Sequence, residues 1–170
     1  MSGWRIRPQM DEIDLEASYG GNPTVFSIRL HYGVEFTKFP GRKYIKGQQN
    51  FVDLIDGDLF SVHDIDDMME ELGCVEEGKV MYYHFKQPLG DLDFGLFVLG
   101  SDQDVNHLRS YVASHKLIDV YIEFWRTNLH TYAMSPNPSK LILKRLLNPL
   151  LVLEGCVLNG STQPQLNPLF

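Results

Sequence analysis

Residues 25–32, VFSIRLHY, decide the class of fold, because apolar and polar side chains alternate along them without a break. Phe26, Ile28 and Leu30 fall on one side of an extended chain, and the polar residues between them fall on the other. A period of two is typical of a strand with one buried face. The stretch therefore predicts a strand whose even-numbered side chains point into a core.

The sequence that follows this strand predicts a hairpin. Gly33 permits a tight reversal, residues 34–39 are expected to form the returning strand, and Pro40-Gly41 closes it. Residues 44–55 favour extended structure but are interrupted by the polar run GQQN, which predicts a long connection containing a short strand. Two antiparallel strands therefore open the predicted domain.

Two helices are predicted by a serine cap followed by an apolar stripe. Ser61 is followed three residues later by Asp64, and Ser101 by Asp104, which is the reciprocal pairing of a capping box. Gly73 is well placed to end the first helix. The stripes recur at helical spacing and consist of Val62, Ile65, Met68, Met69 and Leu72 in the first helix and of Val105, Leu108, Tyr111 and Val112 in the second.

Three further strands are predicted over residues 79–85, 95–99 and 118–124. The order of elements is therefore ββαββαβ. An α+β domain with this order corresponds to a β-grasp, in which a mixed sheet is covered by two helices.

Loop-forming runs divide the chain into three parts. The run GGNP ends a segment with little periodicity, so we expect a flexible N-terminal tail over residues 1–23. The β-grasp domain is expected to span residues 24–134. The run SPNP then opens a C-terminal tail, residues 135–170, in which we expect a short helix followed by poorly ordered chain.

The charge of the chain bears on the class of its partners. The 170 residues carry a net charge of −7, and residues 1–134 carry 12 basic and 21 acidic side chains, a net of −9. Nucleic-acid-binding domains draw much of their affinity from Lys and Arg, so this balance disfavours nucleic acid and favours other protein domains as partners. Without an export signal or an apolar stretch that could span a bilayer, we expect no membrane partner and a soluble intracellular protein, in the nucleus or the cytoplasm.

No residue pattern predicts catalysis, a cofactor or a metal ion. Asp93-Phe94-Gly95 spells a kinase magnesium motif, but the sequence lacks the phosphate loop and the catalytic loop that kinases need, so we expect a turn there. Cys74 and Cys156 stand alone, and no Cys-x-x-Cys pair exists. We therefore expect a protein that is not an enzyme.

Several short segments follow one another in the order of a known family. They are FSIRLHYG from Phe26, FPGRKY from Phe39, LFS from Leu59, IDDM from Ile65, ELG from Glu71, VMYY from Val80, GL from Gly95, DQDV from Asp102 and VYIE from Val120. Together they resemble the Phox/Bem-one-like (PB-one-like) domain of plant proteins, which is found at the N-terminus of Mutator-like (MuDR-type) transposases and their relatives. The resemblance covers roughly residues 24–135.

This resemblance implies a ubiquitin-like β-grasp that binds other protein domains, copies of itself included, head to tail through opposite charges. Carried onto this sequence, Arg29 on the first strand, together with Lys38, would form the basic side. The acidic side would consist of Asp91, Asp93, Asp102 and Asp104. Leu96 follows Gly95 where the broader pattern has an acid, which is a departure on the acidic side.

A dense basic cluster surrounds the predicted hairpin turn and comprises Lys38, Arg42, Lys43 and Lys46. It is either a solvated loop or a docking surface for an acidic partner, and in the second case Arg42 and Lys43 join the basic side. The resemblance also implies an alternative function, a DNA-binding or transposition accessory role in a truncated transposase-derived protein.

Overall fold

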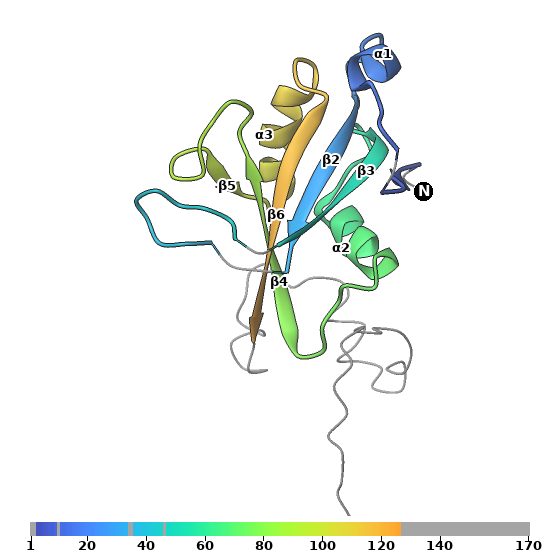
Figure 1. Ribbon diagram of the computed structural model, residues 1–170. Coiled ribbons are helices and arrows are strands. Elements are labelled where there is room, and N and C mark those ends of the chain that lie inside the picture. Colours follow the sequence, from blue (N-terminus) through green and yellow to red (C-terminus); the bar gives the residue numbers. More distant parts are fainter. Residues whose placement is uncertain (1–2, 10, 34–35, 46, 127–170) are drawn as a thin grey trace, which may run out of the picture.

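The computed structural model describes residues 3–9, 11–33, 36–45 and 47–126, and these form a mixed six-stranded sheet with helices (Figure 1). The strand order is β1-β3-β2-β6-β4-β5; β2 and β6 are parallel, and the other neighbouring pairs are antiparallel. The elements are β1 (Arg5–Ile6), α1 (Leu15–Tyr19), β2 (Val25–Tyr32), β3 (Gln48–Asp56), α2 (Val62–Glu71), β4 (Lys79–Lys86), β5 (Leu96–Val98), α3 (Asp102–Val112) and β6 (Leu117–Arg126). From β2 onward the order is ββαββαβ, which confirms the predicted α+β class with a ubiquitin-like β-grasp.

One face of this sheet, here called the helix face, carries the hydrophobic core. Phe26, Ile28 and Leu30 of β2 are fully buried, as the alternation predicts. They belong to one cluster with buried residues of β4, β6, α2 and α3, so both long helices cover the same face. The other face, here called the open face, carries the intervening polar residues of β2.

Both long helices begin at the predicted serine residues. The Asp64 carboxylate accepts a hydrogen bond from the Ser61 backbone N–H at 2.7 Å, and the Asp104 carboxylate accepts one from the Ser101 N–H at 2.9 Å. A capping box is present at each site. Gly73 follows α2 with a φ of 67°, a conformation that glycine adopts without strain.

The returning strand of the hairpin lies elsewhere than predicted. It is β3, which pairs with β2 from Val25↔Asp56 to Tyr32↔Gln48. Of the predicted range, residues 34 and 35 lie outside the described residues, and residues 36–39 do not pair with β2. The described residues 36–45 instead close on themselves through a bridge between Phe36 and Tyr44. The turn signal at Gly33 does not lead directly into a returning strand, because Phe36 packs onto the aromatic rings of the open face instead of pairing with β2.

The N-terminal segment also differs from the flexible tail that we predicted, because β1 and α1 pack onto the domain. β1 pairs with β3, and the Arg7 guanidinium donates two hydrogen bonds to the fully buried Asp53 carboxylate, at 2.8 and 2.6 Å. A β-bulge in β3 opposite Ser27 lies beside this pair, where the register shifts between Phe26 and Ile28. The Tyr19 hydroxyl of α1 accepts hydrogen bonds from Ser27 Oγ and from the Leu54 backbone N–H in the same cluster.

The C-terminal tail that we predicted, together with residues 127–134, lies outside the described residues. Within the described part of the chain, none of the helices has the length and apolar character needed to cross a membrane.

Candidate protein-interaction surface

The centre of the open face is occupied by an ion cluster around Asp119 of β6. Arg29 of β2 donates a hydrogen bond from Nε to the Asp119 carboxylate at 2.5 Å, and His31 Nε2 lies 2.8 Å from the same oxygen. Burial alone would raise the pKa of Asp119, but the hydrogen bonds from His31 and Arg29 outweigh it and hold this pKa well below its usual range. Arg29, the predicted basic residue of the first strand, is therefore half-buried and already paired within the molecule.

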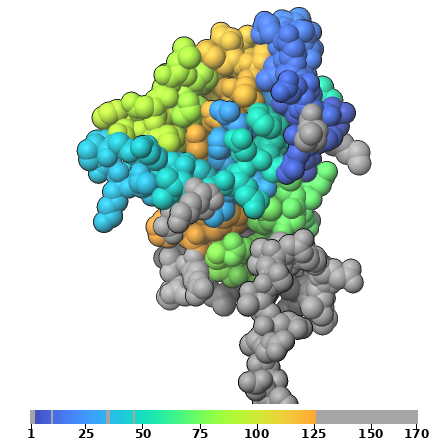
Figure 2. All heavy atoms as spheres, viewed as in Figure 1, coloured from blue at the N-terminus to red at the C-terminus, as the bar shows by residue number. Residues whose placement is uncertain are grey.

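A loop formed by residues 36–45, here called the basic loop, lies beside this cluster. Its two arms are joined by hydrogen bonds from the Thr37 N–H to the Lys43 carbonyl and from the Lys43 N–H to Thr37 Oγ1, both at 2.8 Å. Lys38 and Lys43 are exposed and make no ion pair with any residue that the structure describes. Figure 2 shows the loop projecting from the left of the molecule. Of the predicted basic residues, Lys38 and Lys43 are therefore the ones available to a partner.

Residues 91–95, here called the acidic loop, are hydrogen-bonded directly to the basic loop. The Asp93 carboxylate accepts hydrogen bonds from the backbone N–H groups of Gly41 at 2.6 Å and Arg42 at 2.8 Å. These bonds hold the pKa of Asp93 below its usual value. Two segments that we expected to act as separate sides of an interface thus lie together in one molecule.

The remaining predicted acids divide between structural and exposed positions. Asp91 forms a turn by accepting hydrogen bonds from the N–H groups of Asp93 and Phe94, so the turn that we predicted for the kinase-like motif is present. Asp104 caps α3, and Asp102 stands exposed in the first turn of that helix. A side chain at Gly95 would meet the Asp91 carbonyl at 2.7 Å, which explains the glycine in this tight loop.

A second acidic surface, which the sequence reasoning missed, lies on α2 and the turn after it. Its exposed carboxylates are here called the α2 acids and are Asp67, Glu70, Glu71, Glu76 and Glu77. No Lys or Arg occurs between Val62 and Gly78. Positions 67, 70 and 71 fall on the helix side opposite the buried Met68 and Met69, so helical spacing could have revealed them. In Figure 1, α2 lies on the right of the sheet and the basic loop projects on the left.

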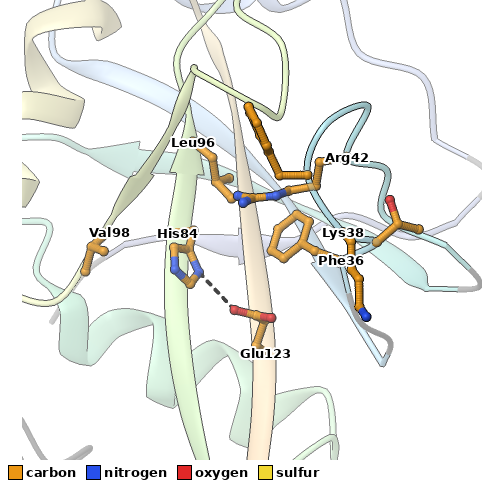
Figure 3. A pocket seen from close by; sticks show the side chains of 9 residues that line it. Phe36, Lys38, Arg42, His84, Leu96, Val98 and Glu123 are labelled. Atoms are coloured by element: carbon orange, nitrogen blue, oxygen red, sulfur yellow. Dashed lines mark ion pairs between the residues drawn. The ribbon is translucent and has the colours of Figure 1, made fainter.

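A groove of about 410 Å³ separates the basic loop from β4 and β5 (Figure 3). Phe36, Lys38 and Arg42 line it from the loop, while Leu96 and Val98 line it from β5. Its other lining residues are Thr37, Phe39, His84 and Glu123.

Charged groups sit on both walls of this groove. His84 Nδ1 lies 3.6 Å from a Glu123 carboxylate oxygen. Burial lowers the pKa of His84, and the positive charge of Arg42 lowers it further. The guanidinium carbon of Arg42 lies 5.9 Å from the centre of the Phe36 ring. The groove therefore combines apolar side chains with a cationic wall.

Among the described residues, no three His, Cys, Asp or Glu side chains are placed to share a metal ion. Cys74 packs against the core, and Cys156 lies outside the described residues. The surface features that could serve a function are thus the charged loops, the α2 acids and the groove.

Comparison with known proteins identifies a family over most of the described region. A family model described as the PB1-like domain matches residues 22–124, which is more than half of the chain. Searches of curated proteins and of solved structures found no match.

Proposed function

Since the chain belongs to the PB1-like domain family, we propose that it pairs head to tail with other protein domains, copies of itself included, through opposite charges. PB1-like domains generally mediate protein interactions and are typically non-catalytic. The basic side of the pairing is the basic loop, with Lys38, Lys43 and the guanidinium of Arg42. The acidic side is the set of α2 acids other than Glu76, whose carboxylate already pairs with Lys79 at 2.5 Å.

The observation that carries this proposal is the separation of the two charged surfaces. The basic loop lies on the open face, whereas α2 covers the helix face, so one copy can offer each surface to a different neighbour. Head-to-tail pairing needs this arrangement because two surfaces that met within one molecule would neutralise each other. Asp91, Asp93 and Asp104 are less suited to the acidic side because their carboxylates already hold backbone N–H groups.

The expected association is weak and sensitive to salt. An exposed ion pair contributes roughly 0.2–1 kcal/mol, so the few pairs that this surface can form give limited affinity. Exposed charges are screened beyond a Debye length of about 8 Å at physiological ionic strength. Self-association should therefore weaken as salt is added, which light scattering can follow.

Two complementary charge-reversal variants test the proposal. Lys38→Glu/Lys43→Glu removes the basic side, and Glu70→Lys/Glu71→Lys removes the acidic side. Each variant alone should be monomeric, and an equal mixture should form a heterodimer, because each contributes the surface that the other lacks. Light scattering coupled to size-exclusion chromatography at low salt reads the masses directly.

The control reverses two exposed acids elsewhere on the molecule. Glu12→Lys/Glu16→Lys changes the net charge by the same amount as the α2 variant but lies in the N-terminal segment. It should associate like the unmodified protein. The proposal is wrong if the mixture stays monomeric, or if the control loses association to the same extent as the α2 variant.

A DNA-binding accessory role is the alternative function. Its difficulty is electrostatic, because the basic loop is a small positive area on a region with a net charge of −9 over residues 1–134. Fluorescence anisotropy with labelled duplex DNA at low salt would favour it if binding were seen and then lost in Lys38→Glu/Lys43→Glu.

A further inference from the structure

The β5 edge of the sheet has backbone groups that point toward solvent. β5 pairs with β4 alone among the described strands. The Gly95 carbonyl accepts from the Gln87 N–H at 2.7 Å, and the Leu99 N–H donates to the Tyr83 carbonyl at 2.8 Å, so the odd-numbered residues face β4. In an antiparallel pair the intervening residues face the opposite way. The N–H and C=O groups of Leu96 and Val98 are therefore available to another strand.

Exposed hydrophobic side chains concentrate next to this edge. Of the nine large hydrophobic residues that are exposed in the described chain, five belong to the basic loop or to residues 87–98: Phe39, Ile45, Leu89, Phe94 and Val98. The Phe39 and Phe94 rings contact each other edge to face, with centroids 5.7 Å apart. Exposed aromatic and aliphatic groups gathered in one place are typical of interaction sites, where such residues act as anchors.

The groove lies where the side chains of an added strand would project. Leu96 and Val98 direct their side chains into it, together with Phe36 from the basic loop (Figure 3). Side chains alternate along a strand, so every second residue of a strand added to β5 would face this groove. Its walls suit apolar side chains near β5 and acidic side chains near Lys38 and Arg42.

We propose that the β5 edge and this groove bind an extended segment of another protein, which adds to the sheet as a strand. Its groove-facing residues, every second one along the strand, include both apolar and acidic side chains. The basic loop supplies the charge preference, since it carries three cations and no acid among its described residues. A second copy docking through its own β5 edge would bring two basic loops together, and their repulsion disfavours that occupant. This site is separate from the α2 acids and does not depend on head-to-tail pairing.

Peptide binding to the full 170-residue protein tests the proposal. The probe is a short fluorescein-labelled peptide in which every second residue is valine or glutamate in turn and the residues between them are threonine, so that one face of the strand carries both. Its binding is followed by fluorescence anisotropy. Two comparison peptides replace valine with serine or glutamate with lysine. The valine–glutamate peptide should bind at least about tenfold more tightly than either, because each substitution removes one of the two interactions.

The Val98→Pro variant tests whether the peptide pairs with the backbone of the β5 edge. Proline at this position removes an N–H that faces away from β4, so the pairing of β4 with β5 is kept while an added strand loses a partner. The variant should weaken peptide binding about tenfold while urea denaturation shows the unmodified stability. Glu70→Lys/Glu71→Lys is the matched control and should bind the peptide normally, which separates this site from head-to-tail pairing.

Amide hydrogen exchange gives a readout that simple charge attraction would not produce. Bound peptide should protect the N–H groups of Leu96 and Val98 and leave that of Phe97 unchanged. The proposal is overturned if the valine–glutamate peptide does not bind, or if it binds without protecting these two amides. It is also overturned if Val98→Pro abolishes self-association, because the occupant would then be a second copy.

Discussion

The two edges of the sheet are built in opposite ways. At the β3 edge, β1 completes the sheet, and Arg7 and Asp53 form a buried ion pair. At the other edge, β5 leaves backbone groups and the side chain of Val98 exposed, and the nearby cations Lys38 and Lys43 have no ionic partner among the described residues. A protein usually protects its sheet edges against pairing with other chains. The β1 edge is anchored by a buried ion pair, whereas the β5 edge has exposed apolar and backbone groups, which is why we propose that a partner binds at the β5 edge.

The contrast separates residues that maintain the fold from residues that serve association. A buried charge that loses its partner destabilises the protein strongly, whereas an exposed side chain contributes little to stability. Substitutions at the β3 edge should therefore affect unfolding, and substitutions at the β5 edge should affect binding.

The largest effect is expected for Arg7→Ala. This change leaves the fully buried Asp53 carboxylate without its cation, which should lower the free energy of unfolding by about 3–5 kcal/mol. Urea denaturation followed by circular dichroism measures it. Glu12→Ala, on an exposed side chain of the same N-terminal segment, is the control and should change stability by less than about 0.5 kcal/mol. A loss below about 1 kcal/mol for Arg7→Ala would show that the edge is not closed by this pair.

A smaller loss of stability is expected for substitution of Asp119, which lies on β6 in the interior of the sheet. Its pKa is lower in the folded than in the unfolded state, so its contribution is complete above the unfolded pKa of about 3.9 and is lost as the pH falls through the folded pKa. Asp119→Asn should lower stability at neutral pH by about 1–2 kcal/mol, a value reduced because Arg29 is partly exposed to solvent. The difference from the unmodified protein should narrow as the pH is lowered below about 4. If the difference in unfolding free energy between Asp119→Asn and the unmodified protein stayed constant across this pH range, the pKa of Asp119 would not be lowered by folding.

A local effect on hydrogen exchange is expected for Asp93→Ala, in the loop that precedes β5. The N–H groups of Gly41 and Arg42 lose their acceptors, so hydrogen exchange at these two amides should become faster. Asp102→Ala serves as the comparison, because its exposed side chain contacts neither loop, and it should leave both rates unchanged. Unchanged exchange in Asp93→Ala would mean that the basic loop is held by other contacts.

The smallest effect on stability is expected for Val98→Lys. Its side chain is exposed, so the free energy of unfolding should change by less than about 0.5 kcal/mol. Lysine at Ile6 of β1, on the opposite edge of the sheet, should lower the free energy of unfolding by about 1–3 kcal/mol because Ile6 packs against the core. Equal losses for the two variants in urea denaturation would remove the distinction between the edges.

The parts of this fold that could be predicted from sequence are those with a local pattern, either a regular spacing of apolar residues or a capping pair. Alternation located β2, β4 and β6, and the serine caps located both long helices. β1 and α1 were missed because two and five residues are too few for a period to be recognised. Phe36 was misassigned because a glycine turn does not indicate whether the chain after it pairs with the preceding strand or forms a loop whose aromatic residue packs back onto the sheet.

The candidate site was predictable only in part, because its properties depend on contacts between distant residues. Strand alternation placed Arg29 on the polar face, but its partner Asp119 lies 90 positions away along the chain. Likewise, nothing near Asp93 in the sequence indicates that its carboxylate holds the basic loop, 51 and 52 positions earlier. The roles that we propose for Lys38 and Lys43 rest on their exposure, which only the three-dimensional structure supplies.

The buried contact between Arg7 and Asp53 has a practical consequence for where this domain begins. Family similarity starts at residue 22, yet Asp53 lies inside the matched region and its cation lies before it. Tyr19, whose hydroxyl contacts Ser27 and Leu54, also precedes the matched region. A fragment cut at the family boundary would expose the β3 edge and leave a carboxylate in the interior without a counter-ion. We therefore expect the smallest stable unit to include β1 and α1, with a boundary set by packing rather than by similarity.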